Sequence, residues 1–423
     1  MNLSVGRLYI KLPKPLRIFW LVNIALTGLC VAIMHRERQL HRQEPYTSPF
    51  IPFHHFIDLV CFISRFQHVH RLDFFSEATS FGQRFMYPAP VALLYESFYA
   101  SGWHLVRLFF LGTMIPVLAL GVILGREMVR RGIGPGTTLL FLSSAAFFSY
   151  PFWFEYLLGN MEICIFLIVA FGIVAFLRQH FVLAATLIGV AASMKIFPFV
   201  YFALFLSRRK YKELALGVFA AAVTTLASLW LVCPSLPIAY RGVRSGLAAF
   251  QRLYILQFLP VETGFDHSIF GFIKLIFFHF YRATTIPSHL LTGYLAFASV
   301  TGLALYFFRI RFLPLLNQVL CLSIASILLP PTSHDYTLLH LYVPWGLMVL
   351  FAIDQARANR SMDRLMSVFI CFAILMSAES ELIYEMKGHS GQLKAIVLVV
   401  LLYIGLKYPF GPVETQIRVP ADA

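Results

Sequence analysis

Long apolar runs alternate with short polar segments along almost the whole chain. Windows of roughly 20 apolar residues recur from end to end, and an α-helix needs about that length to cross a hydrocarbon core of about 30 Å. The pattern therefore predicts an all-α polytopic membrane protein. We expect a single membrane domain in which about 10–12 transmembrane helices form a bundle.

The apolar runs divide the chain into segments on the two sides of the membrane. Basic residues precede the first run, so the positive-inside rule places the N-terminus in the cytoplasm. The expected segments are a cytoplasmic N-terminus (1–15), a first outer loop with interfacial helices (35–103), helices (104–232), a second outer region (233–287), C-terminal helices (288–408) and a cytoplasmic tail (409–423).

One apolar run does not fit a simple alternation of crossings. Arg178 and the basic cluster at residues 208–212 both belong in the cytoplasm, yet a single crossing over residues 181–206 would separate them. Lys195 and Pro198 interrupt this run. Irregular backbone at membrane depth is tolerated where it lines a cavity. We therefore expect a broken or re-entrant helix over residues 181–206.

Composition supports the membrane interpretation and excludes other classes. The chain is 59% hydrophobic and 13% charged, whereas soluble domains are typically about 45–50% apolar and about 25% charged. The net charge of +14 comes from short Lys and Arg clusters at the ends of apolar runs, which is the positive-inside pattern. The six cysteines form no CxxC pair and no close set with histidine. We expect no nucleic-acid partner, no metal site and no cofactor.

The most polar long stretch is residues 53–90, within the first outer loop. Asp58 stands there among apolar neighbours, where an unpaired carboxylate is costly. It is a candidate general base, because such a base lies near a substrate hydroxyl in a site partly shielded from water. The alternative is a helix cap or a surface acid paired with Arg65 or Arg71, and the sequence leaves both interpretations open.

Other polar residues lie next to apolar runs. Tyr87 precedes a Pro-Ala-Pro turn, which suits an interfacial aromatic belt or a simple re-entry into the membrane. Asn160 and Glu162 follow a glycine, where they are suited to bind sugar hydroxyls or a phosphate-bound cation; a plain turn with a C-capping glycine is the alternative. Asp266 and His267 form a weaker pair in the second outer region.

Lys195 is the polar residue that lipid penalises most, because it lies in an apolar run with no acid nearby in sequence. Contact with an anionic substrate such as a lipid phosphate would explain it, and pairing with an acid from another helix is the alternative. A polar turn at residues 333–336 follows two prolines, and His340 comes shortly after it. His334 or His340 is a candidate to bind phosphate or to position an acceptor; an interfacial polar turn is the alternative.

Taken in order, these features resemble the integral-membrane GT-C glycosyltransferases, in particular the polyprenyl-phosphate-mannose-dependent enzymes of glycosyltransferase family 87. The shared order is an outer-loop aspartate, an aromatic-Tyr-Pro-x-Pro element, a Gly-Gln-x-Asn-like turn, a membrane Lys-x-x-Pro and a Pro-x-Ser-x-x-Tyr turn. The resemblance runs from about residue 16 to residue 350. Each motif is short, so the order carries the resemblance.

The resemblance implies a role for each matching residue. Asp58 corresponds to the catalytic base, and Lys195 to a lysine near the donor phosphate, helped by His334 or His340. Ala89 stands where the family usually has proline, and the turn carries Asn and Glu where the family has Gln and Asn. The implied substrate-binding residues are Tyr87, Asn160, Glu162, Ser333, Asp335 and Tyr336.

The implied reaction is an inverting transfer of a sugar, mannose by the resemblance, from polyprenyl phosphate to a hydroxyl of a lipid-linked or glycan acceptor. The implied partners are this donor, the acceptor and membrane lipids. The implied location is the plasma or inner membrane, with the active site facing the periplasm or exterior. A polytopic transporter or flippase for a lipid-linked or anionic substrate is the main competing class, and it predicts pseudo-symmetric halves with polar residues near the midplane. A non-catalytic assembly protein is the third class.

Overall fold

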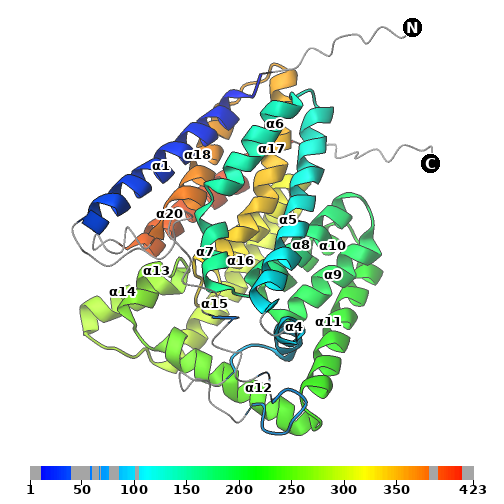
Figure 1. Ribbon diagram of the computed structural model, residues 1–423, viewed down its shortest axis with the longest axis vertical. Coiled ribbons are helices and arrows are strands. Elements are labelled where there is room, and N and C mark those ends of the chain that lie inside the picture. The colour runs from blue at the N-terminus through cyan, green and yellow to red at the C-terminus, as the bar shows by residue number, and fades with distance from the viewer. Residues whose placement is uncertain are drawn as a thin grey trace.

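The computed structural model describes residues 11–39, 58–59, 66, 68–75, 85–100, 104–380 and 389–411. Within these ranges the chain is built from helices and contains no strand, apart from an isolated antiparallel bridge between Gln257 and Thr285. Figure 1 shows long helices that run roughly side by side, with shorter helices laid across one end.

The helices are bounded as follows: α1 Lys14–Gln39, α4 Ala89–Tyr99, α5 Leu105–Arg130, α6 Pro135–Phe147, α7 Tyr150–Leu158, α8 Glu162–Leu177, α9 Phe181–Met194, α10 Phe202–Ser207, α11 Tyr211–Val232, α12 Leu236–Phe250, α13 Pro260–Phe265, α14 Ile269–Tyr281, α15 Ser288–Phe308, α16 Leu315–Leu328, α17 Tyr342–Arg357, α18 Asp363–Ser377 and α20 Ser390–Lys407. Short 3₁₀ segments are η2 Phe197–Tyr201, η4 Ile310–Phe312 and η5 Asp335–Leu341, and Gln251–Leu256 forms a π-helical turn.

Six helical stretches in the described ranges are long and apolar enough to cross a membrane. Shorter apolar helices pack among them, including α8, α9 and α16. The predicted all-α, multi-pass membrane fold is therefore confirmed. The candidate spans are Lys14–Ile33, Leu105–Arg130, Tyr211–Val232, Ser288–Phe312, Asp335–Arg357 and Ser390–Lys407.

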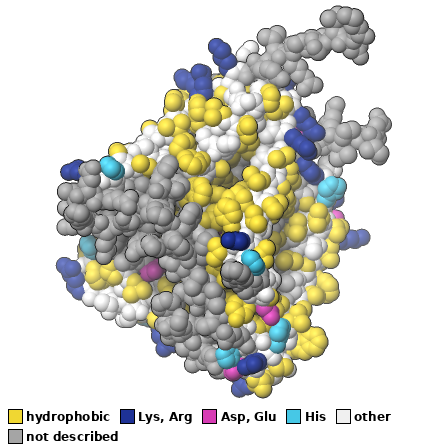
Figure 2. All heavy atoms as spheres, viewed as in Figure 1, with side chains coloured by type: hydrophobic (Ala, Val, Ile, Leu, Met, Phe, Trp, Pro, Cys, Tyr) yellow, Lys and Arg dark blue, Asp and Glu magenta, His cyan; other side chains and the backbone are white. Residues whose placement is uncertain are grey.

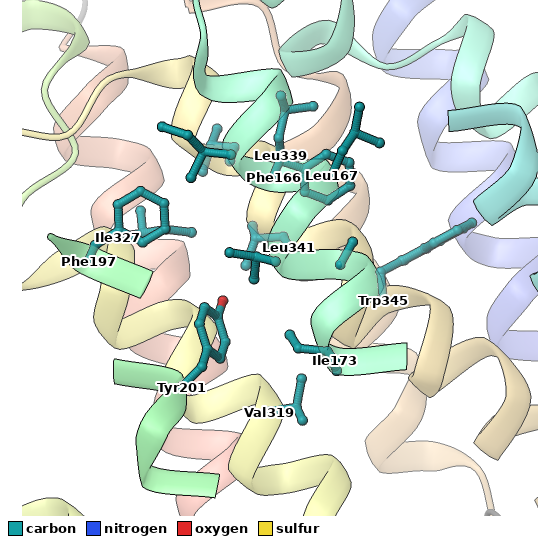
Figure 3. Packing of buried hydrophobic residues seen from close by; sticks show 14 of the residues in the cluster. Phe166, Leu167, Ile173, Phe197, Tyr201, Val319, Ile327, Leu339, Leu341 and Trp345 are labelled. Atoms are coloured by element: carbon teal, nitrogen blue, oxygen red, sulfur yellow. The ribbon is translucent and has the colours of Figure 1, made fainter. Parts of the chain in front are cut away.

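The core lies around α17, whereas α5 lies at the surface. In the most apolar window of each span, 78% of the residues are buried for Asp335–Arg357 but only 11% for Leu105–Arg130. Figure 3 shows Ile173 of α8, Val319 of α16 and Leu341 of η5 gathered in this core, while Trp345 of α17 points away from them. The Trp345 ring packs against Phe141 of α6 at 5.8 Å. The exposed face of α5 is apolar, as lipid contact requires; it includes Leu108, Leu111, Ile115 and Leu118.

The run over residues 181–206 is broken, as predicted. The α9 helix ends at Lys195, whose backbone is extended at φ −153° and ψ 145°. Residues 197–207 then continue as η2 and α10, which have 5 and 6 residues. Together they are much shorter than the 22-residue helix α11. Pro198 stands in the first turn of η2, where its fixed φ and missing N–H are tolerated.

This broken run turns back on itself and so resolves the problem of alternation. The ring of Phe205 lies 5.0 Å from that of Phe176 near the end of α8, and the Lys210 ammonium lies 4.5 Å from the ring of Phe181. At the other end of α8, Lys195 contacts Glu162. Residues 181–194 therefore pass in one direction and residues 196–207 return, which places Arg178 and the 208–212 cluster at the same end.

One end of the bundle carries the basic clusters that the sequence places in the cytoplasm. At the basic end Arg131 pairs with Asp354, and Arg309 donates to the carbonyl of Leu406. Figure 2 shows dark-blue Lys and Arg side chains along this upper end. Helices α4, α12, α13 and α14 gather at the opposite end in Figure 1. Residues 233–287 lie opposite the basic clusters. We name that end the outer end, after the sequence-based prediction that these residues form an outer region.

Helices α9 and α11 approach closely through glycines, so we expect Gly189→Ala to lower the melting temperature. A Cβ at Gly189 would lie 2.2 Å from the carbonyl oxygen of Gly217, and overpacking typically costs about 1–3 kcal/mol. Gly121→Ala in α5 is the matched control, because nothing lies within 4 Å of its Cβ position and alanine favours a helix. Thermal unfolding in detergent measures both variants. Equal melting temperatures for them would contradict the close approach.

Candidate active site

Asn160 joins three segments at the outer end. Helix α7 ends at Gly159, which adopts the left-handed conformation at φ 63° and turns the chain toward α8. The Nδ2 of Asn160 donates to Oδ2 of Asp58 at 2.7 Å and to the hydroxyl of Tyr87 at 3.1 Å. Its Oδ1 accepts the backbone N–H of Glu162 at 3.0 Å, which caps α8. One buried amide side chain therefore positions both Asp58 and Tyr87.

The surroundings of Asp58 suit a group that gains and loses a proton near neutral pH. Burial raises the pKa of Asp58 to about 6, and the hydrogen bond from Asn160 opposes this rise. Burial also raises the pKa of Tyr87 well above its usual value, with the Asp58 charge adding to the effect. Tyr87 therefore stays protonated while Asp58 exchanges its proton.

The Glu162 carboxylate contacts two of the other predicted site residues, Lys195 and His340. This carboxylate is buried; Lys195 Nζ contacts Oε2 at 2.5 Å, and His340 Nε2 lies 2.9 Å from Oε1. The acid partner of Lys195 thus comes from another helix, which was one of the two interpretations left open. His340 is buried, with the ring of Phe197 at 4.5 Å.

Lys195 is the member of this group that reaches toward solvent. Its side chain is 34% exposed, whereas that of Glu162 is 1% exposed. The ammonium lies 5.1 Å from the centroid of the Tyr336 ring, so it is also within reach of a cation–π interaction. The Tyr336 ring stacks in turn on Phe154 at 6.5 Å. The cation therefore lies at the edge of an aromatic wall.

Two buried carboxylates hold the polar turn at residues 333–336. Asp266 Oδ1 accepts the backbone N–H of Ser268 at 2.9 Å and of Ser333 at 3.0 Å. Its Oδ2 lies 2.8 Å from the ammonium of Lys274, and both of these charged side chains are at most 1% exposed. The backbone N–H of His267 donates to the backbone carbonyl of Ser333 at 2.9 Å. Asp266 and His267, the weaker pair in the sequence, therefore hold the polar turn at residues 333–336 in place.

Asp335 is the second of these carboxylates. It is buried, and it accepts from the Lys394 ammonium at 3.0 Å and from the Tyr150 hydroxyl at 2.8 Å. His267 Nε2 lies 3.6 Å away. Sequence reasoning placed Asp335 among the substrate-binding residues, whereas the structure directs its carboxylate into the protein. Ser333 is likewise buried and hydrogen-bonds to Thr337 at 2.8 Å.

His334 takes part in a half-exposed ion pair at the outer end. Its Nε2 lies 2.9 Å from Glu262 Oε2 in α13, and its Nδ1 lies 3.4 Å from the hydroxyl of Tyr336. Burial alone would lower the pKa of His334, but the Glu262 carboxylate outweighs burial and raises it. Burial acts upward on the pKa of Glu262, and His334 lowers it overall. The pair is therefore charged over a wider pH range than either residue alone.

Several buried groups at this end were not among the predicted site residues. Lys274 and Lys394 lie in apolar helices with no acid beside them, the same signal that drew attention to Lys195. Glu155 is fully buried in α7 and its Oε1 accepts the N–H of Ile163 at 2.9 Å. Glu262 gives no such signal, because it lies in the short helix α13, outside the long apolar runs. No group of three or more His, Cys, Asp or Glu in the described ranges is arranged to hold a metal ion.

The pair between Lys394 and Asp335 predicts a specific stability pattern. Lys394→Met leaves a buried carboxylate without its cation, which typically costs about 3–5 kcal/mol, so its melting temperature should fall. Adding Asp335→Asn removes the stranded charge and keeps an acceptor for Tyr150, so stability should largely recover.

The matched control is Lys407→Met, which changes an exposed lysine at the end of the same helix and should leave the melting temperature unchanged. A Lys394→Met protein as stable as the wild type, or a double variant less stable than the single one, would rule out this role of the pair.

Comparison with known proteins adds the family. No curated protein and no solved structure matches the chain. The model of glycosyltransferase family 87 matches residues 85–378, which is well over half of the 423 residues. This match includes Tyr87, Asn160, Lys195 and the 333–336 turn and begins after Asp58. The site residues at the outer end thus belong to a multi-pass membrane protein, and the chain is a member of glycosyltransferase family 87.

Proposed function

We propose that the protein is an inverting glycosyltransferase that moves a sugar from polyprenyl phosphate to a hydroxyl of a lipid-linked or glycan acceptor. Mannose is the proposed sugar, because the order of motifs resembles that of polyprenyl-phosphate-mannose-dependent enzymes. The family supplies glycosyl transfer. The observation that carries the finer proposal is the convergence of Asp58, Tyr87 and Asn160, which come from separate segments and meet through one amide group.

Asp58 is the proposed general base. A base works best when its pKa lies near the working pH, and burial raises the pKa of Asp58 toward that range. The carboxylate takes the proton of the acceptor hydroxyl as the oxygen attacks the anomeric carbon. The bond from that carbon to the phosphate oxygen breaks, and its electron pair leaves with polyprenyl phosphate. The leaving phosphate is already a weak base, so this reaction needs one carboxylate rather than the acid–base pair of glycosidases.

Lys195 is the proposed partner of the donor phosphate. Its ammonium has three N–H donors, and Glu162 is its one hydrogen-bond partner in the described part of the chain. The remaining donors are suited to phosphate oxygens, because Lys195 is also the most exposed member of its cluster. Such a cation offsets charge that develops as the phosphate leaves. His334, at the same end, is the proposed second phosphate contact.

The remaining predicted residues divide into two proposed roles. Tyr87, Asn160 and Tyr336 are proposed to contact substrate, because each contributes a polar or aromatic group beside Asp58 or Lys195. The other predicted residues are proposed to hold the substrate-contacting side chains in place; they are Glu162, Ser333, Asp335 and His340. The position of the site opposite the basic clusters supports an active site on the outer face of the cell membrane.

Asp58→Asn should abolish transfer without unfolding the protein. Loss of a general base typically costs about 10²–10⁴-fold in rate. The raised pKa means that ionised Asp58 weakens the fold once the pH rises through about 6, so an uncharged asparagine should not lower stability at neutral pH. The assay measures sugar transfer from radiolabelled polyprenyl-phosphate mannose to a membrane lipid extract.

The control for this assay is Glu96→Gln. It neutralises another outer-end acid, whose carboxylate pairs with His70 at 2.9 Å. Undiminished transfer by a folded Asp58→Asn protein would remove Asp58 from the chemistry.

The Asn160 hydrogen bond should appear in the pH dependence of the reaction. The wild-type value of kcat/KM should fall as the pH decreases through about 6, because Asp58 becomes protonated. Asn160→Ala removes the bond that favours the ionised carboxylate, so the acid limb of this profile should move to higher pH. An acid limb that stays in place in the variant would show that another group is titrating.

A further inference from the structure

Helix α12 presents arginines at an end of the bundle where the positive-inside rule predicts few of them. Arg241 and Arg244 in α12 and Arg252 in the π-helical turn that follows are exposed, and residues 236–256 contain no acid. Among the described residues none of the three has an acidic partner; Arg241 donates to the carbonyl of Pro237 at 3.2 Å. Exposed arginines in this position are suited to pair with an anion.

The length of α11 fixes the depth of α12 in the membrane. Helix α11 has 22 residues and is therefore about 33 Å long, close to the thickness of the hydrocarbon core. It begins at the basic end and ends at Val232, and α12 begins at Leu236. Figure 1 shows α12 running across the lower end of α11. The arginines of α12 therefore lie at the depth of the lipid headgroups of the outer face.

The two faces of α12 differ as an interfacial helix requires. Its inner face carries glycines: a Cβ at Gly242 would lie 2.3 Å from Phe75, and one at Gly246 would lie 2.0 Å from the carbonyl oxygen of Phe85. The outer face combines the arginines with exposed apolar and aromatic side chains, as amphipathic helices at membrane surfaces do; these are Leu236, Tyr240 and Leu247.

We propose that α12 and the π-helical turn after it lie in the membrane surface and bind the phosphate groups of anionic phospholipids through Arg241, Arg244 and Arg252. The guanidinium group matches phosphate in a bidentate geometry. Each basic residue near an anionic surface strengthens binding by about fivefold, so three give up to about a hundredfold. This role is separate from glycosyl transfer and needs no sugar substrate.

The lipid contact has a consequence for the site. The glycine face of α12 rests on Phe75 and Phe85, and Tyr87 follows Phe85 by two residues. Lipid bound to the outer face is therefore separated by one helix from the segment that leads to Tyr87.

Hydrogen–deuterium exchange of the full-length protein in nanodiscs tests the proposal locally. Wild type is compared in phosphatidylcholine alone and in phosphatidylcholine mixed with phosphatidylglycerol. We expect slower exchange over residues 236–256 when phosphatidylglycerol is present. The variant Arg241→Gln/Arg244→Gln/Arg252→Gln should lose this difference, while peptides from the buried helix α16 confirm that the fold is kept.

The matched control is Arg241→Lys/Arg244→Lys/Arg252→Lys, which keeps the charge and should keep most of the lipid-dependent protection. The proposal is overturned if wild-type exchange in this region is the same in both lipids. It is also overturned if the glutamine variant keeps the full protection, since the arginines would then play no part in it.

Discussion

The site depends on the two hydrogen bonds that the Asn160 amide donates. An amide nitrogen has two protons, and here one goes to Asp58 at 2.7 Å and one to Tyr87 at 3.1 Å, while the amide oxygen caps α8. This amide thereby joins Asp58 and Tyr87 to the turn between α7 and α8. The capping bond fixes the orientation of the amide, because a flipped side chain would lose the α8 cap and the Asp58 contact together. The geometry of Asp58 therefore follows from the geometry of the α7–α8 turn.

Buried pairs of lysine with an acid organise the rest of the outer end. Lys195, Lys274 and Lys394 each meet a carboxylate from a different part of the chain. A buried charge without a partner is strongly unfavourable, so such pairs penalise any arrangement in which the segments separate. Two of the three pairs are closed to solvent and hold the 333–336 turn. The third leaves its lysine partly exposed beside Tyr336, and that difference separates a candidate phosphate contact from a structural pair.

The sequence predicted the fold class well and the site in part. Apolar runs define spans because lipid accepts little else, and the break at Lys195 was visible because lysine and proline interrupt such a run. The return over residues 196–207 matches the re-entrant form of this break, which the sequence did not separate from a broken crossing. The acid partner of Lys195 was left open, because Glu162 lies 33 residues away and meets it only once α8 and α9 form a hairpin. The contact of Asn160 with Asp58 spans 102 residues, and only the order of motifs suggested it. Like Lys195, Lys274 and Lys394 are lysines in apolar runs with no acid beside them, but the sequence analysis did not single them out. Glu262 has no such sequence signal.

The central claim is that one carboxylate, Asp58, drives direct displacement of the phosphate. Buried Glu155 is one of the acids near Asp58 that a two-step mechanism would use as its nucleophile, and its Oε1 accepts the N–H of Ile163. The anomeric configuration of the product tests the claim most directly. Product formed by the wild-type protein from a donor of known configuration is isolated, and the anomeric carbon is assigned by nuclear magnetic resonance. The account predicts inversion relative to the donor. Retention would require a covalent intermediate on a second nucleophile and would contradict the account.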